Sequence, residues 1–298
     1  MTAATLERVP EIVRKIRQVP DDVRRFAITA TAARSRHRVS AKLLDVLVTA
    51  GLPYAGSGEH RLYDDYDVSN AALHLGLMSV QRMALRSWAN ALRHNDGQEV
   101  IRARAGFAPK CAAPGHAGDC RFEVLQPGGN RAVRTGSGNG TDLLDPLDAV
   151  IAGSWPQLPA PVRELIGEIA DLDFFLMPEV IRWDPEFMLR TRIADCGGVA
   201  RWLVDEGNRR GLPARFGFGL LVTVPYSTPH CWAEFLVEGR WTPVDPLLLG
   251  ALRRLGLLDW PPHRSTGAVL FRMADRFTKL VSHNGVWAEL SLRTEAIR

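Results

Sequence analysis

The hydrophobic pattern of this chain changes near residue 190, from the three- and four-residue steps of helices to the alternation of strands. Apolar spacing predicts one helix over residues 196–210. Strand-like segments follow it at residues 214–224, 230–238, 240–245, 268–273, 278–282 and 285–292. One helix followed by a series of antiparallel strands is typical of an α+β fold, so we expect this half of the chain to pack a helix on a sheet.

The first 95 residues predict a mainly helical region. Apolar residues recur at helical spacing over residues 6–16, and a second pattern begins near Asp21. A third helix is expected after Ser40, which can act as its N-cap, and a fourth over about residues 67–93. We interpret this region as a helical bundle, with helix-turn-helix pairing as the alternative.

The character of the sequence changes again between residues 96 and 140. Short strands are expected at 99–107 and 121–125, and five glycines within 126–141 indicate a flexible connection or an exposed loop. Residues 142–190 return to a helical pattern that prolines interrupt. We therefore divide the chain into residues 1–140, mainly helical with a short β and loop segment, and a second domain, residues 141–298.

Composition excludes several classes of protein. Hydrophobic residues are 46% and charged residues 23% of the chain, which is globular rather than disordered. The net charge is only +4, and no basic cluster is interleaved with aromatic residues, so no nucleic-acid partner is expected. No apolar run is long enough to span a membrane, and the N-terminus lacks the pattern of a secretory signal. The sequence therefore predicts a cytoplasmic protein with no membrane partner.

Four cysteines are too few and too dispersed for a disulfide scaffold. Cys111, His116 and Cys120 lie within ten residues of one another, and this spacing leaves open a zinc site. A structural zinc site wants four ligands, and the nearby sequence supplies no fourth. We therefore expect no metal ligands here and interpret the segment as a turn-rich loop with unreactive thiols, with zinc as the alternative. No cofactor is expected for the chain.

The residues around Cys196 predict a reactive thiol. Asp195 can cap a helix that begins at Cys196 and ends before Gly211. At a helix N-terminus, the unpaired N–H groups and the positive end of the dipole favour a thiolate. Gly197 and Gly198 cost the first turn stability, and we interpret them as room for the backbone of a substrate to approach the sulfur.

The strands after this helix carry an imidazole and a carboxylate. Residues 230–237 alternate as a strand, with His230 on one face and Cys231, expected to be a core thiol, on the other. A turn at 238–240 leads to a returning strand that ends at Asp245. This arrangement predicts a nucleophile, a base and an orienting acid in the order Cys196, His230, Asp245.

These motifs resemble the transglutaminase-like core of the papain-like cysteine superfamily. They are Asp-Cys-Gly-Gly at 195–198, Arg-Gly-Leu-Pro-Ala-Arg at 210–215, His-Cys-Trp-Ala-Glu at 230–234 and Arg-Trp-Thr-Pro-Val-Asp-Pro at 240–246. The resemblance covers about residues 160–250, or extends to the C-terminus, and leaves the N-terminal region outside it. It implies a papain-like α+β fold for the second domain, which would be catalytic. It implies that Cys196 is the nucleophile, His230 the base and Asp245 the orienting acid. One departure is Cys231, where alanine is usual in the family.

The implied chemistry is acyl transfer through a thioester on the cysteine, most simply the formation or exchange of an amide bond. Expected partners are a small-molecule or peptide acyl donor, which includes a carrier-protein thioester, and an amine acceptor. An amidase or narrow peptidase would hydrolyse the same intermediate, and a scaffold protein would keep the fold without the reaction. Candidates for the second oxyanion donor are Trp183, Arg190 and Arg192. Pro225 and Tyr226 are expected to border the cleft.

Overall fold

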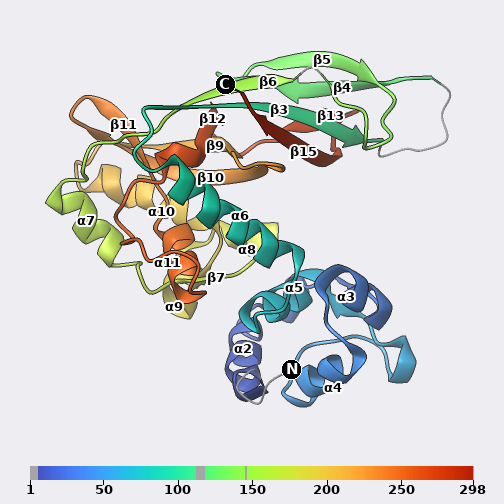
Figure 1. Cartoon of the computed structure of the whole chain (residues 1–298). Coiled ribbons are helices and arrows are strands. Elements are labelled where there is room, and N and C mark those ends of the chain that lie inside the picture. Colours follow the sequence, from blue (N-terminus) through green and yellow to red (C-terminus); the bar gives the residue numbers. More distant parts are fainter. Residues whose placement is uncertain (1–5, 112–117, 145, 298) are drawn as a thin grey trace. The chain divides into compact units, whose positions relative to one another are not determined.

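A computed structural model describes residues 6–111, 118–144 and 146–297 (Figure 1). These residues form two compact units. The first takes the chain up to Arg86, Ile169–Gly198 and Leu247–Trp260, and the second takes Ser87–Glu168, Val199–Pro246 and the chain from Pro261 onward. The fold is mixed helix and antiparallel sheet, which confirms the α+β prediction. The division at residue 140 stays a prediction, and pairing between strands crosses it.

The first unit begins with short helices, drawn in blue and cyan in Figure 1: α2 (Val9–Ile16), α3 (Ala30–His37), α4 (Ala41–Thr49) and α5 (Asp65–His74). As predicted, the Ser40 side chain caps α4 by accepting a hydrogen bond from the N–H of Leu43. A 3₁₀ turn (Asp21–Val23), another (Gly58–His60) and a two-stranded ladder of β1 (Phe26–Ile28) and β2 (Tyr63–Asp64) complete this part.

The predicted helix over residues 67–93 is instead two helices, α5 and α6 (Val80–Asn95). Gly76 separates them with a φ of 77°, a left-handed conformation that continues no α-helix. The apolar spacing does not reveal this break, because both helices bury residues such as Leu73 and Leu85.

Later parts of the chain complete the first unit. They are β7 (Asp173–Phe174), α8 (Glu179–Arg182), α9 (Pro185–Thr191), β8 (Ile193–Ala194) and α11 (Pro246–Arg254). Strands β7 and β8 pair in parallel, so the segment that leads to Cys196 is fixed by backbone hydrogen bonds. Sequence reasoning missed α11, because it follows an Asp-Pro pair that is usually just a turn.

The described residues of the second unit form three antiparallel sheets. One orders its strands β15-β3-β6, from β3 (Val100–Lys110), β6 (Leu147–Ala152) and β15 (Glu289–Ala296). Another is β14-β13-β4-β5, from β4 (Cys120–Leu125), β5 (Arg131–Gly136), β13 (Val281–His283) and β14 (Val286–Trp287). The third is β11-β10-β9-β12, from β9 (Ala214–Leu221), β10 (Thr228–Val237), β11 (Arg240–Val244) and β12 (Leu270–Ala274). A helix α7 (Ala160–Gly167) and a 3₁₀ turn (Gly267–Val269) accompany them.

The expectation for the glycine-rich stretch holds in part. Its turn is exposed, but it belongs to a hairpin rather than to a flexible connection, since Gly128 and Gly129 turn the chain with φ of 89° and 85° and β5 pairs with β4. The helical pattern expected after it is wrong at its start. Residues 147–152 form strand β6 rather than helix. The segment alternates in burial, with Ala149 and Ile151 buried, and this period of two marks a strand that the surrounding helical pattern obscures.

Helix α10 (Cys196–Arg209) packs on the third sheet, as the sequence predicts. A Cβ on Gly207 would lie 2.8 Å from the ring of Phe235 on β10, so the glycine allows the helix and sheet to approach closely. Gly211 has a φ of 73° just after the helix, which agrees with its predicted role at the helix end. The predicted turn between β10 and β11 is made by Glu238 and Gly239, both with positive φ. Among the described residues, no helix combines the length and the apolar composition that crossing a bilayer requires.

Side chains of α5 hold the chain just after β7. The buried amide of Asn70 donates to the carbonyl of Leu176 at 3.0 Å and accepts from its N–H at 2.8 Å. Four residues along the helix, the His74 Nε2 bonds to the carbonyl of Phe174 at 2.8 Å. Burial lowers the pKa of His74, so the ring is neutral and Nε2–H is the donor. The N-terminal helices and the segment that precedes the cysteine therefore fold together.

We expect Asn70→Ala to destabilise the protein by about 2–4 kcal/mol, because it leaves the N–H and the carbonyl of Leu176 without their partner. Urea unfolding followed by circular dichroism measures the change. Asn90→Ala, an exposed position on α6, is the matched control and should stay within about 0.5 kcal/mol of the parent protein. Equal effects of the two substitutions would contradict this role of Asn70.

Candidate active site

Cys196 opens helix α10, as the sequence predicts. The carboxylate of Asp195 accepts a hydrogen bond from the N–H of Gly198 at 3.1 Å, so it caps the helix. The preceding strand β8 is buried and pairs with β7, which fixes where the first turn begins. Cys196 is half-buried as a residue and takes part in no disulfide.

The two glycines after Cys196 make room for protein, and not for substrate as the sequence analysis supposed. A Cβ on Gly197 would lie 2.9 Å from the indole ring of Trp183. A Cβ on Gly198 would fall well inside van der Waals contact with the backbone carbonyl oxygen of Arg182. The last turn of α8 therefore presses on the first turn of α10, and the glycines permit that close approach.

Asp195 also forms an ion pair with α8. Its Oδ2 lies 2.8 Å from the Nε of Arg182, and its side chain is buried. Burial raises the pKa of Asp195 to about 7, and a negative charge on the adjacent Cys196 raises it further. The Arg182 guanidinium and the N–H groups of Gly198 and Gly197 oppose this increase of the pKa. The carboxyl group beside the nucleophile thus changes charge near neutral pH.

Gly198→Ala should destabilise the protein by about 1–3 kcal/mol, because the new methyl group meets the Arg182 backbone, which cannot rotate away as a side chain could. Gly167→Ala, at the last residue of α7 with nothing within 4 Å of the added Cβ, should be neutral or stabilising by up to about 1 kcal/mol. Thermal unfolding of the two variants measures the contrast. A harmless Gly198→Ala would show that the two helices are not in close contact.

Asp195→Asn should change how stability depends on pH. A carboxyl whose pKa is raised by folding binds protons in the folded state that it has released in the unfolded one, so its contribution favours folding at low pH. This contribution is lost as pH rises from about 4 to about 7. Urea midpoints should therefore fall across this range in the parent protein more than in Asp195→Asn, which retains the capping oxygen. Parallel pH profiles would contradict the raised pKa.

His230 and Asp245 meet in the second unit. The imidazole Nε2 lies 2.5 Å from the carboxylate Oδ2 of Asp245, and both side chains are buried. His230 stands on β10 opposite Gly219 of β9, and Asp245 directly follows β11. The antiparallel β10–β11 hairpin brings them together, as its predicted turn implies. Two of the three predicted site residues, His230 and Asp245, are therefore in contact.

Trp232 and Glu234 continue the His230 face of β10. The ring of His230 stacks near Trp232, with centroids 6.5 Å apart, and Trp88 of α6 lies 6.0 Å from the imidazole. The Trp232 Nε1 donates to Glu234 at 3.0 Å, and the Nε of Arg215 donates to the other carboxylate oxygen at 2.6 Å. The imidazole is thus walled by indole rings, and the buried carboxylate behind them has partners.

The other residues that the sequence singled out make contacts of their own, away from the His230–Asp245 pair. Cys231 is 3% exposed on the opposite face of β10, which agrees with a core thiol. Of the suggested oxyanion donors, Trp183 packs against Gly197, Arg190 lies over the ring of Phe187 at 5.9 Å, and Arg192 pairs with Asp171. Sequence reasoning missed Trp88, because its helical spacing alone marks it as a core residue.

Cys196 belongs to the first unit, whereas His230 and Asp245 belong to the second. The approach of the thiol to the imidazole therefore stays a prediction. The identity of the second oxyanion donor also stays a prediction.

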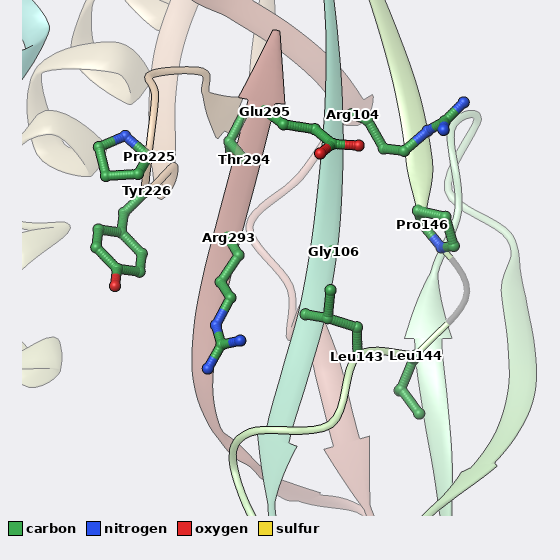
Figure 2. Close-up of a pocket in the computed structure, with 10 residues that line it drawn as sticks. All are labelled: Arg104, Gly106, Leu143, Leu144, Pro146, Pro225, Tyr226, Arg293, Thr294 and Glu295. Carbon is green, nitrogen blue, oxygen red and sulfur yellow. The ribbon is translucent and has the colours of Figure 1, made fainter. Parts of the chain in front are cut away.

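Figure 2 shows a cavity of about 510 Å³ in the second unit. Strands β3 and β15 lie across its middle, with Pro225 and Tyr226 on one side and Arg104 and Pro146 on the other. The loop is attached to β15, since the N–H of Thr294 donates to the carbonyl of Pro225 at 2.7 Å. None of Cys196, His230 and Asp245 lines this cavity, so the residues expected to border the cleft face a different hollow.

Residues 179–246 match the family model of the transglutaminase-like superfamily, and this range contains Cys196, His230 and Asp245. The chain therefore carries a transglutaminase-like core, which supports a cysteine-dependent enzyme.

A solved structure, a candidate cysteine protease from Cytophaga hutchinsonii, is also similar. It is 11% identical, with a TM-score of 0.35, and the match covers 67% of this chain and 89% of that one. No curated protein matches the chain significantly.

Proposed function

We propose that this protein transfers acyl groups through a thioester on Cys196, with His230 as the general base and Asp245 as the group that orients it. The observation that carries the proposal is the buried hydrogen bond of 2.5 Å between His230 and Asp245, inside the range that matches the transglutaminase-like superfamily. A nucleophile, a base and an orienting acid are the three parts that thiol-based acyl transfer requires. The location proposed for this reaction, the cytoplasm, rests on the sequence alone.

The contact made by His230 assigns roles to its two nitrogens. Asp245 accepts the proton of Nε2, so Nδ1 is the atom that takes the proton from the thiol of Cys196. The carboxylate also stabilises the imidazolium that this transfer creates. A cysteine thiol has an ordinary pKa of about 8.5, and the N-terminus of α10 lowers the energy of the thiolate.

The reaction then proceeds in two halves. The thiolate attacks the acyl carbon, and the backbone N–H of Cys196 is the first donor to the oxyanion. Collapse of the tetrahedral intermediate breaks the bond to the leaving group, which takes the proton from Nδ1 of His230 and leaves a thioester on Cys196. An amine then attacks the thioester, gives its proton to His230 and releases Cys196 as the thiol, so that an amide forms.

Hydrolysis is the alternative outcome of the same intermediate. If water replaces the amine, the protein is an amidase or a narrow peptidase with the same three residues. The donor is a small molecule, a peptide or a carrier-protein thioester in either case. We favour the amine because a separate group of N-terminal helices folds with the nucleophile segment and is large enough to recognise a second substrate.

The proposal predicts a covalent adduct on Cys196. Incubating the full chain with acyl thioesters and with peptides, followed by mass spectrometry of the intact protein, should reveal an added acyl group. Cys196→Ala should abolish the adduct, and Cys231→Ser, a buried thiol on the other face of β10, should keep it. Equal labelling of the parent protein and Cys196→Ala would favour a scaffold protein.

Asp245→Asn should lower kcat about 10²–10⁴-fold while the protein stays folded, because an amide keeps the shape of the carboxylate but not its charge. Steady-state turnover of the best donor from the adduct screen measures the loss. Product masses with and without added amine separate aminolysis from hydrolysis. An Asp245→Asn variant with full turnover would contradict the role of the hydrogen bond to His230.

A further inference from the structure

Three potential metal ligands converge within the second unit. Cys111, Cys120 and His283 each offer one ligand atom, and these atoms all lie within 4.8 Å of one another. The sulfur of Cys111 is 3.7 Å from Nδ1 of His283, although 172 positions separate them in the chain. His116, which the sequence analysis grouped with the cysteines, lies outside the described residues.

The strands fix this arrangement. Cys111 directly follows β3, and its N–H donates to the carbonyl of Gly138 at 2.8 Å. Cys120 opens β4, and His283 ends β13, where it pairs with Phe122 of β4. Since Phe122 and Cys120 are two residues apart on one strand, they share a face, and the His283 side chain lies diagonally across from the Cys120 thiol.

Gly138 shows how closely the backbone encloses the two thiols. A Cβ on this residue would lie 2.8 Å from the sulfur of Cys120 and 2.9 Å from the Cβ of Cys111, and its φ is 64°. Only glycine fits there without displacing the sulfur atoms. Cys120 is 2% exposed and His283 is 7% exposed, so most of the cluster is shielded from water.

The spacing and the donor types fit Zn²⁺. Zinc–sulfur bonds of about 2.3 Å and zinc–nitrogen bonds of about 2.0–2.1 Å in a tetrahedron place sulfur and nitrogen about 3.6 Å apart. The observed separation between Cys111 Sγ and His283 Nδ1 is 3.7 Å. Two thiols and an imidazole are soft donors, which favour zinc over magnesium or calcium. A disulfide between Cys111 and Cys120 would not explain why Nδ1 of His283 lies so close to the Cys111 sulfur.

We infer that Cys111, Cys120 and His283 form a structural zinc site, whose fourth position takes water or another donor. Binding of Zn²⁺ forms two zinc–sulfur bonds and one zinc–nitrogen bond and releases the two thiol protons. Because β3 belongs to one sheet and β4 and β13 to another, the ion links residues from two sheets. This function is independent of acyl transfer at Cys196.

The test is the metal content of the full chain, purified under reducing conditions without added metal. Elemental mass spectrometry should find about one zinc per chain. Cys120→Ser and His283→Gln should each lower the content at least about tenfold. Cys231→Ser, another buried thiol, and Cys196→Ala should keep it, which separates this site from the proposed active site.

A second measurement covers variants that fail to fold. The parent protein, stripped with a chelator and loaded with Co²⁺, should show the visible bands of tetrahedral cobalt and a thiolate charge-transfer band, and chelation should lower its Tm until zinc is returned. Three results would overturn the inference. The parent protein could be folded but contain no metal, Cys111 and Cys120 could form a disulfide under reducing conditions, or Cys231→Ser could lose the metal.

Discussion

The carboxylate of Asp195 is the contact on which the start of the nucleophile helix depends. It caps α10 through the N–H of Gly198, and it pairs with Arg182 of α8 at the same time. Gly197 leaves room for the indole ring of Trp183, and Gly198 leaves room for the backbone carbonyl of Arg182. A buried charge requires such partners, and here they come from two directions. The position and orientation of the first turn of α10 therefore depend on the Asp195–Arg182 ion pair and on the two glycines.

In the second unit, buried carboxylates near His230 likewise have hydrogen-bond partners. Asp245 is buried against His230, and Glu234 is buried between Trp232 and Arg215. Each carboxylate holds a ring in one orientation, because the hydrogen bond fixes which edge of the ring faces inward. The indole rings of Trp88 and Trp232 exclude water from the imidazole, and in such surroundings the charge on Asp245 acts on His230 with little screening.

Features that depend on a short stretch of chain were predictable from the sequence. The cap at Ser40, the helix that begins at Cys196 and the hairpin that brings Asp245 to His230 all follow from local spacing and turn residues. Features that depend on distant partners were not. The contact of Trp183 with Gly197 depends on how two helices pack, which local spacing does not indicate. The cluster of Cys111 with His283 joins residues that are 172 positions apart in the chain.

The amide of Asn70 has a consequence for how such a protein can change over evolution. It satisfies both backbone groups of Leu176, so the helix that carries it and the segment before the nucleophile must be inherited as one piece. An exchange of the first helices with those of another protein would remove the partner of that peptide unit. Substitutions on surfaces away from α5 leave this contact unchanged.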